Sequence, residues 1–513
     1  MAASPVFQEL SEEVFADLRN DQHLMSALDY LILTASIVGV TVVGLIASRR
    51  RKATIEQYFM ADRSVHWLAV TATLIATGIS AKSLIGLPGL AYMGDLTYMQ
   101  LYLPVPIAVF IVTVVFLPFY SRLKVISAYE YLGMRFGNRT RSFASLLYQL
   151  EYALVLGTVI AAPSLVMSEA VGVRYELCIL IMLVLTVVYT SIGGMKAVIW
   201  TDVLQMGVFI VVPLIVLAYV LSSSVGDYGA LFNAAQAHQK LKMFDLSFVF
   251  TDRITLWAGF ASMLVYHISN YGCSQTLIQR YMTARSQKES RRSIIVSGFG
   301  LVFIWITFLM MGTLLFAYNQ LHPDTIPDGT HGDRVFTAFV MKALPNGLRG
   351  LFIAAAFAAG MSTLSSILHS MGTVTLLDVW KLHSKTPASE ETWVNRARWL
   401  TLMWGVVSFA SALFVLQLGT VITAGIKMGS VIGGTLLGIF LLGIFVRRAV
   451  AQGVIVGAVL SLGTLIGFAL MSDVHWAWYC AIAMTVTVVY GSVISLLFPR
   501  AYCAEELTYR SFL

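Results

Sequence analysis

The residues best suited to chemistry lie within apolar stretches of the chain, and Asp202 is the foremost of them. It follows the glycine pair of the run 189–205, and apolar residues continue after it. An unpaired charge in hydrocarbon is costly, so an acid at membrane depth predicts a functional site. The alternative is that Asp202 caps a helix at the membrane edge, because Thr201 and Asp202 follow a glycine-rich turn.

Hydroxyl side chains mark a second apolar segment, 349–377. The positions i, i+3, i+4 and i+7 of one helical face are Ala359, Ser362, Thr363 and Ser366. Hydroxyl and carbonyl oxygens are ligands that suit a hard cation, so this face predicts a cation site. The alternative is that the hydroxyl groups donate to the carbonyl oxygens one turn earlier, as is common in membrane helices.

Two further apolar segments carry residues that break a helix at mid-depth. The segment 66–92 contains Gly78, Gly86, Pro88 and Gly89, and the segment 254–281 contains the small and polar run 267–275. Unwound backbone is tolerated at this depth only where it lines protein or a cavity, and its free carbonyl groups can then coordinate ions. The alternative is that each break is a kink used for packing.

The elements that position these residues are predicted to be membrane helices. Hydrophobic residues make up 58% of the 513 positions and charged residues only 12%, against roughly 25% charged in soluble domains. A crossing needs roughly 20 apolar residues. Thirteen such runs are present, at 27–47, 66–92, 96–121, 142–169, 175–195, 197–221, 254–281, 293–318, 349–377, 399–417, 421–446, 450–471 and 475–498. We therefore expect an all-α polytopic membrane protein.

The charge distribution predicts how the chain is oriented. Most of the 34 Lys and Arg residues, Arg280 among them, fall in loops that are cytoplasmic when the N-terminus is outside. By the positive-inside rule, the C-terminus is then inside and the number of crossings is odd. The net charge of +7 thus reflects membrane orientation and gives no indication of a nucleic-acid partner.

The spacing of the two breaks predicts an internal repeat. After the first helix, the breaks fall in helices one and six of the remaining twelve, each of which opens a five-helix unit. This is the pattern of inverted repeats with a binding site at their interface. The expected divisions are an extracellular segment 1–26, an extra helix 27–47, repeats 66–221 and 254–446, two C-terminal helices 450–498 and a cytoplasmic tail 499–513.

Four separated motifs resemble the signature regions of the sodium:solute symporter family. They are 127–136, 189–205, 275–281 followed by Ala284 and Ser286, and the alanine-then-hydroxyl helix that ends at 377–378. The resemblance spans nearly the whole chain. It implies a LeuT-like fold of about 13 transmembrane helices in the plasma membrane and alternating access. It also implies symport of a small solute with Na+, and no obligate protein partner.

The resemblance also assigns sodium ligands. For the main site it implies the carbonyl groups of Ala76, Ile79 and Ala359 and the hydroxyl groups of Ser362 and Thr363. For a second sodium ion it implies Asp202, Ser365 and Ser366. Two sodium ions per cycle are therefore expected, with a proton-coupled carrier as the alternative.

The class of substrate is indicated by the positions that bind sugar in sugar-carrying relatives. Here those positions are Ser83, Tyr102, His267, Leu301 and Ile426, and two apolar side chains among them disfavour a hexose. The loop and signature stretches are closer to carriers of monocarboxylates, iodide and vitamins. The run 85–89 is closer to proline and pantothenate carriers. We expect a monocarboxylate or another small anion, with proline or pantothenate as the alternative.

A substrate site is expected around the two breaks. Its candidate residues are Gly78, Ser80, Lys82, Ser83, Tyr102, His267, Asn270 and Tyr271. Lys82 and Lys427 are the cations predicted inside helices, and either could partner a carboxylate. Alternatively, Lys82 faces a vestibule and Lys427 snorkels or pairs with an acid. His267 is equally consistent with an inert core histidine, and Glu151 is an intramembrane acid with no assigned role.

Other classes of protein fit the sequence less well. An enzyme needs a convergent catalytic set, and the nine histidines form no His-x-x-x-His pair. Broken helices in two repeats favour alternating access over an open channel. The cysteines lie in apolar helices or in the tail, so no disulfide framework is expected.

Overall fold

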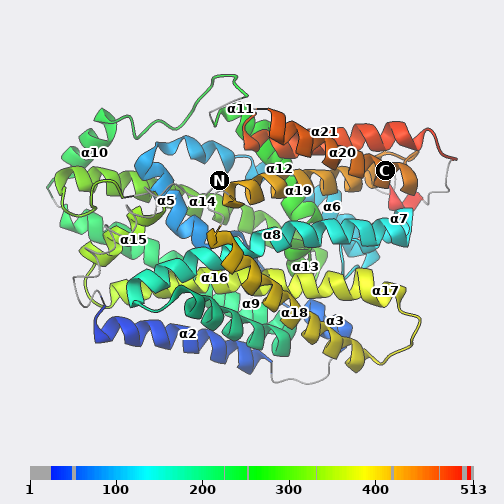
Figure 1. Ribbon diagram of the computed structural model, residues 1–513, viewed down its shortest axis with the longest axis horizontal. Helices are drawn as coiled ribbons and strands as arrows, with labels where there is room; N and C mark the ends of the chain where they lie inside the picture. The colour runs from blue at the N-terminus through cyan, green and yellow to red at the C-terminus, as the bar shows by residue number, and fades with distance from the viewer. Residues whose placement is uncertain are drawn as a thin grey trace.

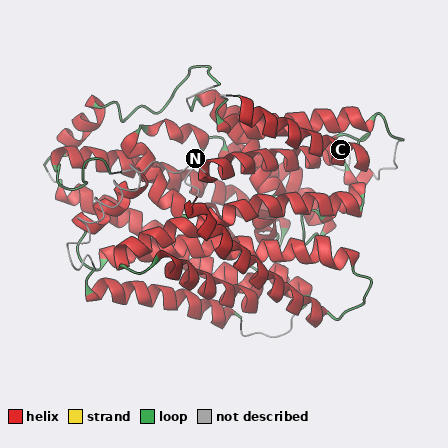
Figure 2. Cartoon of the chain, in the orientation of Figure 1, coloured by secondary structure: helices red, strands yellow, loops and turns green. Residues whose placement is uncertain are grey.

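The computed structural model describes residues 25–48, 54–224, 226–250, 254–330, 332–417, 421–472, 474–499 and 505–509. Nearly all regular structure in these ranges is helical (Figure 2), which confirms the all-α prediction. An isolated parallel bridge pairs Val65 with Ala284. Figure 1 shows the long helices running mostly along the long axis of the molecule, with α10 and α15 at one end and α7 and α17 at the other.

The helices follow the apolar runs of the sequence. In chain order they are α2 (Ala27–Ala47), α3 (Ile55–Met60), α4 (Trp67–Gly78), α5 (Ala81–Met93), α6 (Val105–Leu123), α7 (Glu130–Phe136), α8 (Asn138–Val171), α9 (Tyr175–Ser223), α10 (Tyr228–Ala237), α11 (Leu256–Ala258), α12 (Leu264–Cys273), α13 (Gln275–Tyr281), α14 (Gln287–Leu321), α15 (Gly332–Ala343), α16 (Leu348–Val374), α17 (Lys381–His383), α18 (Glu390–Gln417), α19 (Val421–Phe445), α20 (Ala451–Met471) and α21 (Tyr479–Ser495).

Among the described residues, nine elements are long and apolar enough to cross a membrane, and α4 with α5 adds a tenth as one bent span. Two of the predicted crossings are merged in α9, which has 49 residues and hence a length of roughly 74 Å. That is more than twice the hydrocarbon thickness of about 30 Å. A kink at Gly194 divides α9, with φ 57° and ψ −149°, a conformation that glycine adopts readily. The predicted count of thirteen crossings stays a prediction.

Both predicted helix breaks are present. Helices α4 and α5 meet at an angle of 58° at Ile79 and Ser80, both of which have extended backbones. Helices α12 and α13 are separated at Ser274, with φ −79° and ψ 120°. The first break lies ahead of Gly86, Pro88 and Gly89, which continue the helix inside α5. Packing explains some of these residues, because a Cβ atom at Gly89 would overlap the backbone of Gly332.

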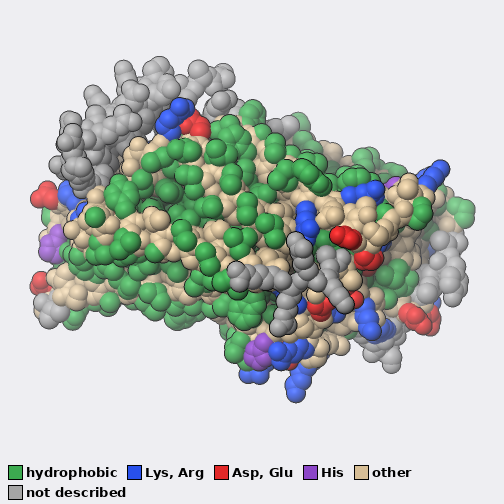
Figure 3. All heavy atoms as spheres, turned by 90° about the horizontal axis from the view of Figure 1, so that it is seen from below, with side chains coloured by type: hydrophobic (Ala, Val, Ile, Leu, Met, Phe, Trp, Pro, Cys, Tyr) green, Lys and Arg blue, Asp and Glu red, His purple; other side chains and the backbone are tan. Residues whose placement is uncertain are grey.

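The surface supports immersion of the molecule in a lipid bilayer. Figure 3 shows hydrophobic side chains over a broad area of one face, with charged side chains gathered mainly toward its edges. Helix α16 is the contrasting element, because 94% of its apolar stretch is buried inside the protein. The helix with the hydroxyl face is therefore surrounded by other helices rather than by lipid.

The extra N-terminal helix is tied to the start of α16 by one carboxylate. Asp29 Oδ2 accepts from the backbone N–H of Ser26 at 2.9 Å, and Asp29 Oδ1 accepts from the N–H groups of Gly347 and Gly350 at 2.7 and 2.8 Å. Asp29 is completely buried. One side chain thus caps the N-termini of α2 and α16 together, where a negative charge is favourable.

We expect Asp29→Ala to lower the free energy of unfolding by about 1–3 kcal/mol, because two buried N–H groups lose their acceptor. Asp29→Asn should retain most of the stability, since the amide oxygen can still accept. Thermal unfolding of the purified protein in detergent measures both variants. The control is Asp62→Ala, which removes an exposed carboxylate paired with Lys196. A wild-type Tm for Asp29→Ala would contradict the capping role.

Candidate functional site

The first break and the hydroxyl face of α16 meet at Thr363. Its hydroxyl oxygen, Oγ1, lies within hydrogen-bond distance of two carbonyl oxygens, 3.2 Å from that of Ile79 and 3.1 Å from that of Ala359. All three residues are buried. Three of the five predicted ligands of the main sodium site therefore lie together at the junction of α4, α5 and α16. The bond to Ala359 is also the one-turn-back bond that was the alternative interpretation, so Thr363 makes both contacts.

The remaining predicted ligands of this site are buried close by. Ala76 lies in the last turn of α4 and is completely buried. Ser362 Oγ donates to Asp202 Oδ1 at 2.7 Å instead of to the backbone one turn earlier. Ser362 therefore connects the main predicted site to the carboxylate predicted for the second site.

Asp202 lies in the interior of α9, eight residues beyond the kink at Gly194, and is completely buried. Its carboxylate accepts hydrogen bonds from the hydroxyl groups of Thr73, on α4, and Ser362, on α16. These partners are side chains on other helices, whereas a helix cap binds the first N–H groups of its own helix. The interpretation of Asp202 as an N-cap is therefore wrong.

Arg280 supplies the positive charge at this site, and its predicted place in a cytoplasmic loop is wrong. It is the penultimate residue of α13 and is completely buried. Its Nε atom lies 3.8 Å from Asp202 Oδ2 and donates to Thr73 Oγ1 at 3.1 Å. The reason is the break before α13, which turns this short helix so that Arg280 points into the protein. The sequence did contain a signal for this position, because an acid predicted at membrane depth, Asp202, needs a cation beside it.

The other residues predicted for a second sodium ion surround the same charge pair. Ser366 Oγ accepts a hydrogen bond from Arg280 and lies 3.1 Å from Thr77 Oγ1. Ser365 Oγ donates to the carbonyl oxygen of Ser362 at 2.9 Å. Arg280 thus bridges Asp202 and Ser366, so the hydroxyl groups, the carboxylate and the guanidinium form one connected network.

At the second break, the free carbonyl groups are already bound. Tyr120 donates its hydroxyl group to the carbonyl of Gly272 at 2.5 Å, Tyr129 to that of Cys273 at 3.3 Å, and Tyr281 to that of Tyr271 at 3.2 Å. These three carbonyl groups therefore each have a hydrogen-bond partner, and ion coordination at this break stays a prediction. Tyrosine side chains stabilise the unwound backbone instead.

The candidate substrate residues divide into two groups. Tyr102 stacks on Trp305 with ring centroids 4.4 Å apart, and His267 lies 6.2 Å from the same indole ring. A ring nitrogen of His267 lies 3.1 Å from the carbonyl oxygen of Leu101. His267 is therefore a buried histidine with a backbone partner, as the inert interpretation expected.

The second group lies at the start of α5 and along α12. Lys82 Nζ donates to Thr158 Oγ1 on α8 at 2.5 Å. Gly78 abuts Leu301, whose side chain would lie 2.8 Å from an added Cβ atom. Ser80 and Ser83 flank the start of α5 and are half-buried, while Tyr271 is buried at the second break. The side chains of Ile426 and Lys427 lie outside the described part of the chain.

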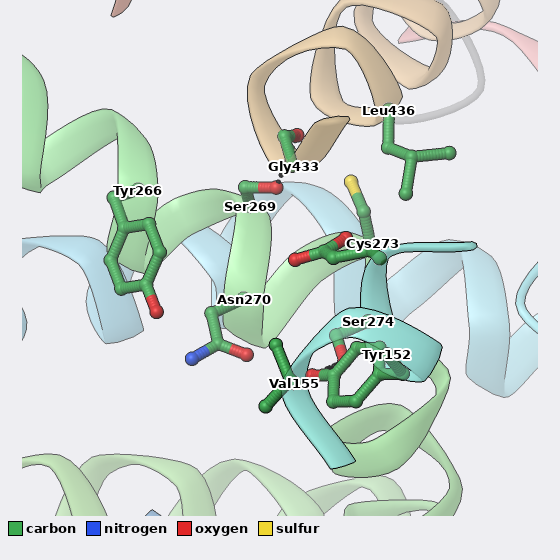
Figure 4. Close-up of a pocket in the computed structure, with 10 residues that line it drawn as sticks. Tyr152, Val155, Tyr266, Ser269, Asn270, Cys273, Ser274, Gly433 and Leu436 are labelled. Atoms are coloured by element: carbon green, nitrogen blue, oxygen red, sulfur yellow. Dashed lines mark hydrogen bonds between the residues drawn. The ribbon is translucent and has the colours of Figure 1, made fainter. Parts of the chain in front are cut away.

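Asn270 opens onto an internal cavity of about 100 Å³ at the second break (Figure 4). The residues that line it come from α8, α12, α19 and the break: Glu151, Tyr152, Val155, Tyr266, Ser269, Asn270, Cys273, Ser274, Gly433 and Leu436. Glu151, which the sequence left without a role, is therefore a lining residue of this cavity.

Comparison with known proteins identifies relatives over almost the whole chain. The model of the "Sodium:solute symporter family" matches residues 58–461. The sodium/sialic acid symporter SiaT of Proteus mirabilis is 30% identical over 486 residues, covering 93% of this chain and 97% of that protein. The sodium-dependent multivitamin transporter of Oryctolagus cuniculus is 32% identical over 447 residues, covering 85% and 69%.

A solved structure is similar in three dimensions. It is the substrate-bound, outward-open state of a Na+-coupled sialic acid symporter, described as revealing a novel Na+ site. Its TM-score is 0.86 at 28% sequence identity, and the match covers 93% of this chain and 100% of that one. The arrangement of α4, α9 and α16 around Asp202 thus belongs to a backbone that closely follows a known sodium-coupled carrier.

Proposed function

This chain belongs to the sodium:solute symporter family, whose members are membrane transporters and not enzymes, and we propose that it imports a small carboxylate-bearing organic solute with sodium by alternating access. The proposal includes thirteen crossings, an outside N-terminus, a cytoplasmic C-terminus in the plasma membrane, and inverted repeats at 66–221 and 254–446. It retains the monocarboxylate prediction within a wider class, because sialic acid is itself a carboxylate. Proline and pantothenate are not singled out by the relatives described above.

The main support for sodium coupling is the position of Thr363. Its hydroxyl oxygen lies beside the carbonyl oxygens of Ile79 and Ala359, which brings three hard oxygen atoms from two helices together in a buried place. Oxygen atoms of this kind suit a hard cation, and the break leaves the carbonyl of Ile79 without a partner in its own helix. We propose Ala76, Ile79, Ala359, Ser362 and Thr363 as the main sodium site, and Asp202, Ser365 and Ser366 as the second.

The main support for a carboxylate-bearing substrate is Lys82. Lys82 is the second residue of the half-helix α5, near the end where the helix dipole adds positive potential. Its described hydrogen bond is to the neutral hydroxyl group of Thr158, and the carboxylate of Asp333 is the described acid that interacts with its charge. Leu301 closes the side of Gly78, which supports the prediction that a hexose is not the substrate.

Uptake into proteoliposomes under an inward sodium gradient tests this proposal. The panel contains N-acetylneuraminate, acetate, pyruvate, lactate, proline and pantothenate. Lys82→Gln is expected to raise the KM of the transported carboxylate about tenfold or more, because one charge-assisted contact is lost, with the sodium dependence unchanged. Lys82→Arg keeps the charge, and Lys196→Gln removes an exposed one as the control. An uptake rate that does not depend on the sodium gradient, or an unchanged KM in Lys82→Gln, would contradict the proposal.

A further inference from the structure

The cavity at the second break contains the carboxyl group of Glu151, which has no hydrogen-bond or ion-pair partner among the described residues. Among its polar groups, the hydroxyl oxygens of Tyr152 and Ser274 lie 2.8 Å apart, and Ser269 Oγ donates to the carbonyl of Gly433 at 2.6 Å. Within the described part of the chain, Glu151 and Asn270 take part in no hydrogen bond or ion pair. No Lys, Arg or His is among the lining residues. Among the described residues, the carboxyl group of Glu151 therefore has no cation beside it in this cavity.

Two tyrosine side chains line the same cavity as this carboxylate. Tyr152 and Tyr266 both line the cavity, and Figure 4 shows Asn270 between them in this view. The face of an aromatic ring attracts a cation, and the attraction grows when water is excluded. A carboxylate beside two tyrosine rings is the combination of groups that recognises an ammonium group. Binding such a group would also remove the cost of an unpaired charge at membrane depth.

The cavity also lies on the same face of α8 as the Lys82 contact. Glu151, Val155 and Thr158 fall at i, i+4 and i+7, which places them on one side of the helix. Lys82 binds Thr158, and seven residues of helix rise by roughly 10 Å. Val155, an apolar lining residue, lies between the two charged groups. A negative and a positive group are therefore held at two levels of one wall, with an apolar surface between them.

We propose that Glu151 is the counter-ion for an ammonium group of the transported solute, so that the substrate is a small amino carboxylate. Its ammonium group binds in the cavity with Glu151, Tyr152 and Tyr266, and its carboxylate group faces Lys82; this second half rests on the function proposed above. The cavity size fits this class. A site for one water molecule needs only about 10–15 Å³ of such space, so about 100 Å³ leaves room for an ammonium group and the carbon atoms next to it.

The test uses a pair of probes that differ in one charged group, γ-aminobutyrate and butyrate. Binding to the purified full-length protein is measured in sodium by tryptophan fluorescence and by thermal stabilisation. Wild-type protein is expected to bind γ-aminobutyrate at least tenfold more tightly than butyrate. Glu151→Gln should reduce this preference to threefold or less, whereas Glu151→Asp should retain it. Glu176→Gln removes an exposed carboxylate of α9 that pairs with Arg174, and should behave as wild type.

A second variant covers the case in which Glu151→Gln does not fold. Tyr266→Leu keeps the carboxylate and removes one ring, so it should weaken γ-aminobutyrate binding and leave butyrate binding unchanged. Tighter binding of butyrate or N-acetylneuraminate than of γ-aminobutyrate would overturn the role of Glu151, while sodium-driven uptake of either anion would leave the proposed function intact. Uptake of butylamine that needs Glu151 but not Lys82 would instead overturn the carboxylate class and support the counter-ion role.

Discussion

Replacing Asp202 by Asn should reduce sodium-driven uptake at least a hundredfold. The side chain keeps its shape, but the completely buried Arg280 loses the carboxylate that lies 3.8 Å from its Nε atom. Removing one partner of a buried pair typically costs about 3–5 kcal/mol, because the other charge is left uncompensated. The same change removes the charged ligand proposed for the second sodium ion. Uptake that remains should rise with sodium as a single-site curve instead of a sigmoidal one.

A double variant separates the structural role of Asp202 from its role in ion binding. Asp202→Asn combined with Arg280→Gln removes both charges, and replacing a whole buried pair is much less harmful than breaking it. The double variant should therefore regain much of the thermal stability lost in Asp202→Asn, without regaining sigmoidal sodium dependence. Sodium titrations of uptake and Tm measurements on the same preparations provide both readouts. If Asp202→Asn keeps wild-type cooperativity, Asp202 binds no sodium ion and the pair with Arg280 is structural.

The second large effect is expected from Ser362→Ala combined with Thr363→Ala. These changes remove two oxygen atoms from the proposed main site, including the one beside the carbonyl groups of Ile79 and Ala359. If each lost contact costs about 1 kcal/mol or more, the sodium concentration for half-maximal uptake should rise by tenfold or more.

The matched control for this pair is Ser370→Ala. Ser370 is buried on the same helix, two turns beyond Thr363, and its Oγ atom donates to the backbone carbonyl of Ser366 at 2.9 Å, so it tests the loss of a hydroxyl group outside the proposed main site. Its sodium dependence should match that of the wild type. A well-folded double variant with unchanged sodium dependence would show that Ser362 and Thr363 are not ligands.

Local patterns in the sequence were sufficient to predict the elements and one face of the site. The apolar runs became helices, and the spacing of Ser362, Thr363 and Ser366 placed them on one buried face of α16. Both breaks were visible because small and polar residues interrupt apolar segments there. These features depend on residues a few positions apart, which is the range that periodicity describes.

Contacts between residues that are far apart in the sequence could not be predicted from such local patterns. Tyr120 binds the carbonyl of Gly272, 152 positions away, and no local pattern relates the two. Arg280 was misplaced for a related reason, since a cation near the end of an apolar run is normally a loop residue at the membrane surface. Its buried position depends on the turn at Ser274 and on an acid in another helix.

The carboxylate of Asp29 has a mechanical consequence for transport. It fastens α2 to the first turn of α16, and Ala359 lies nine residues further along the same helix, a rise of roughly 14 Å. Any sliding or tilting of α16 must therefore either carry α2 with it or break two buried hydrogen bonds. We infer that α2 and α16 move as one rigid body. A covalent link between these two helices would then leave the transport cycle running, whereas a link from α2 to a helix of the moving part would stop it.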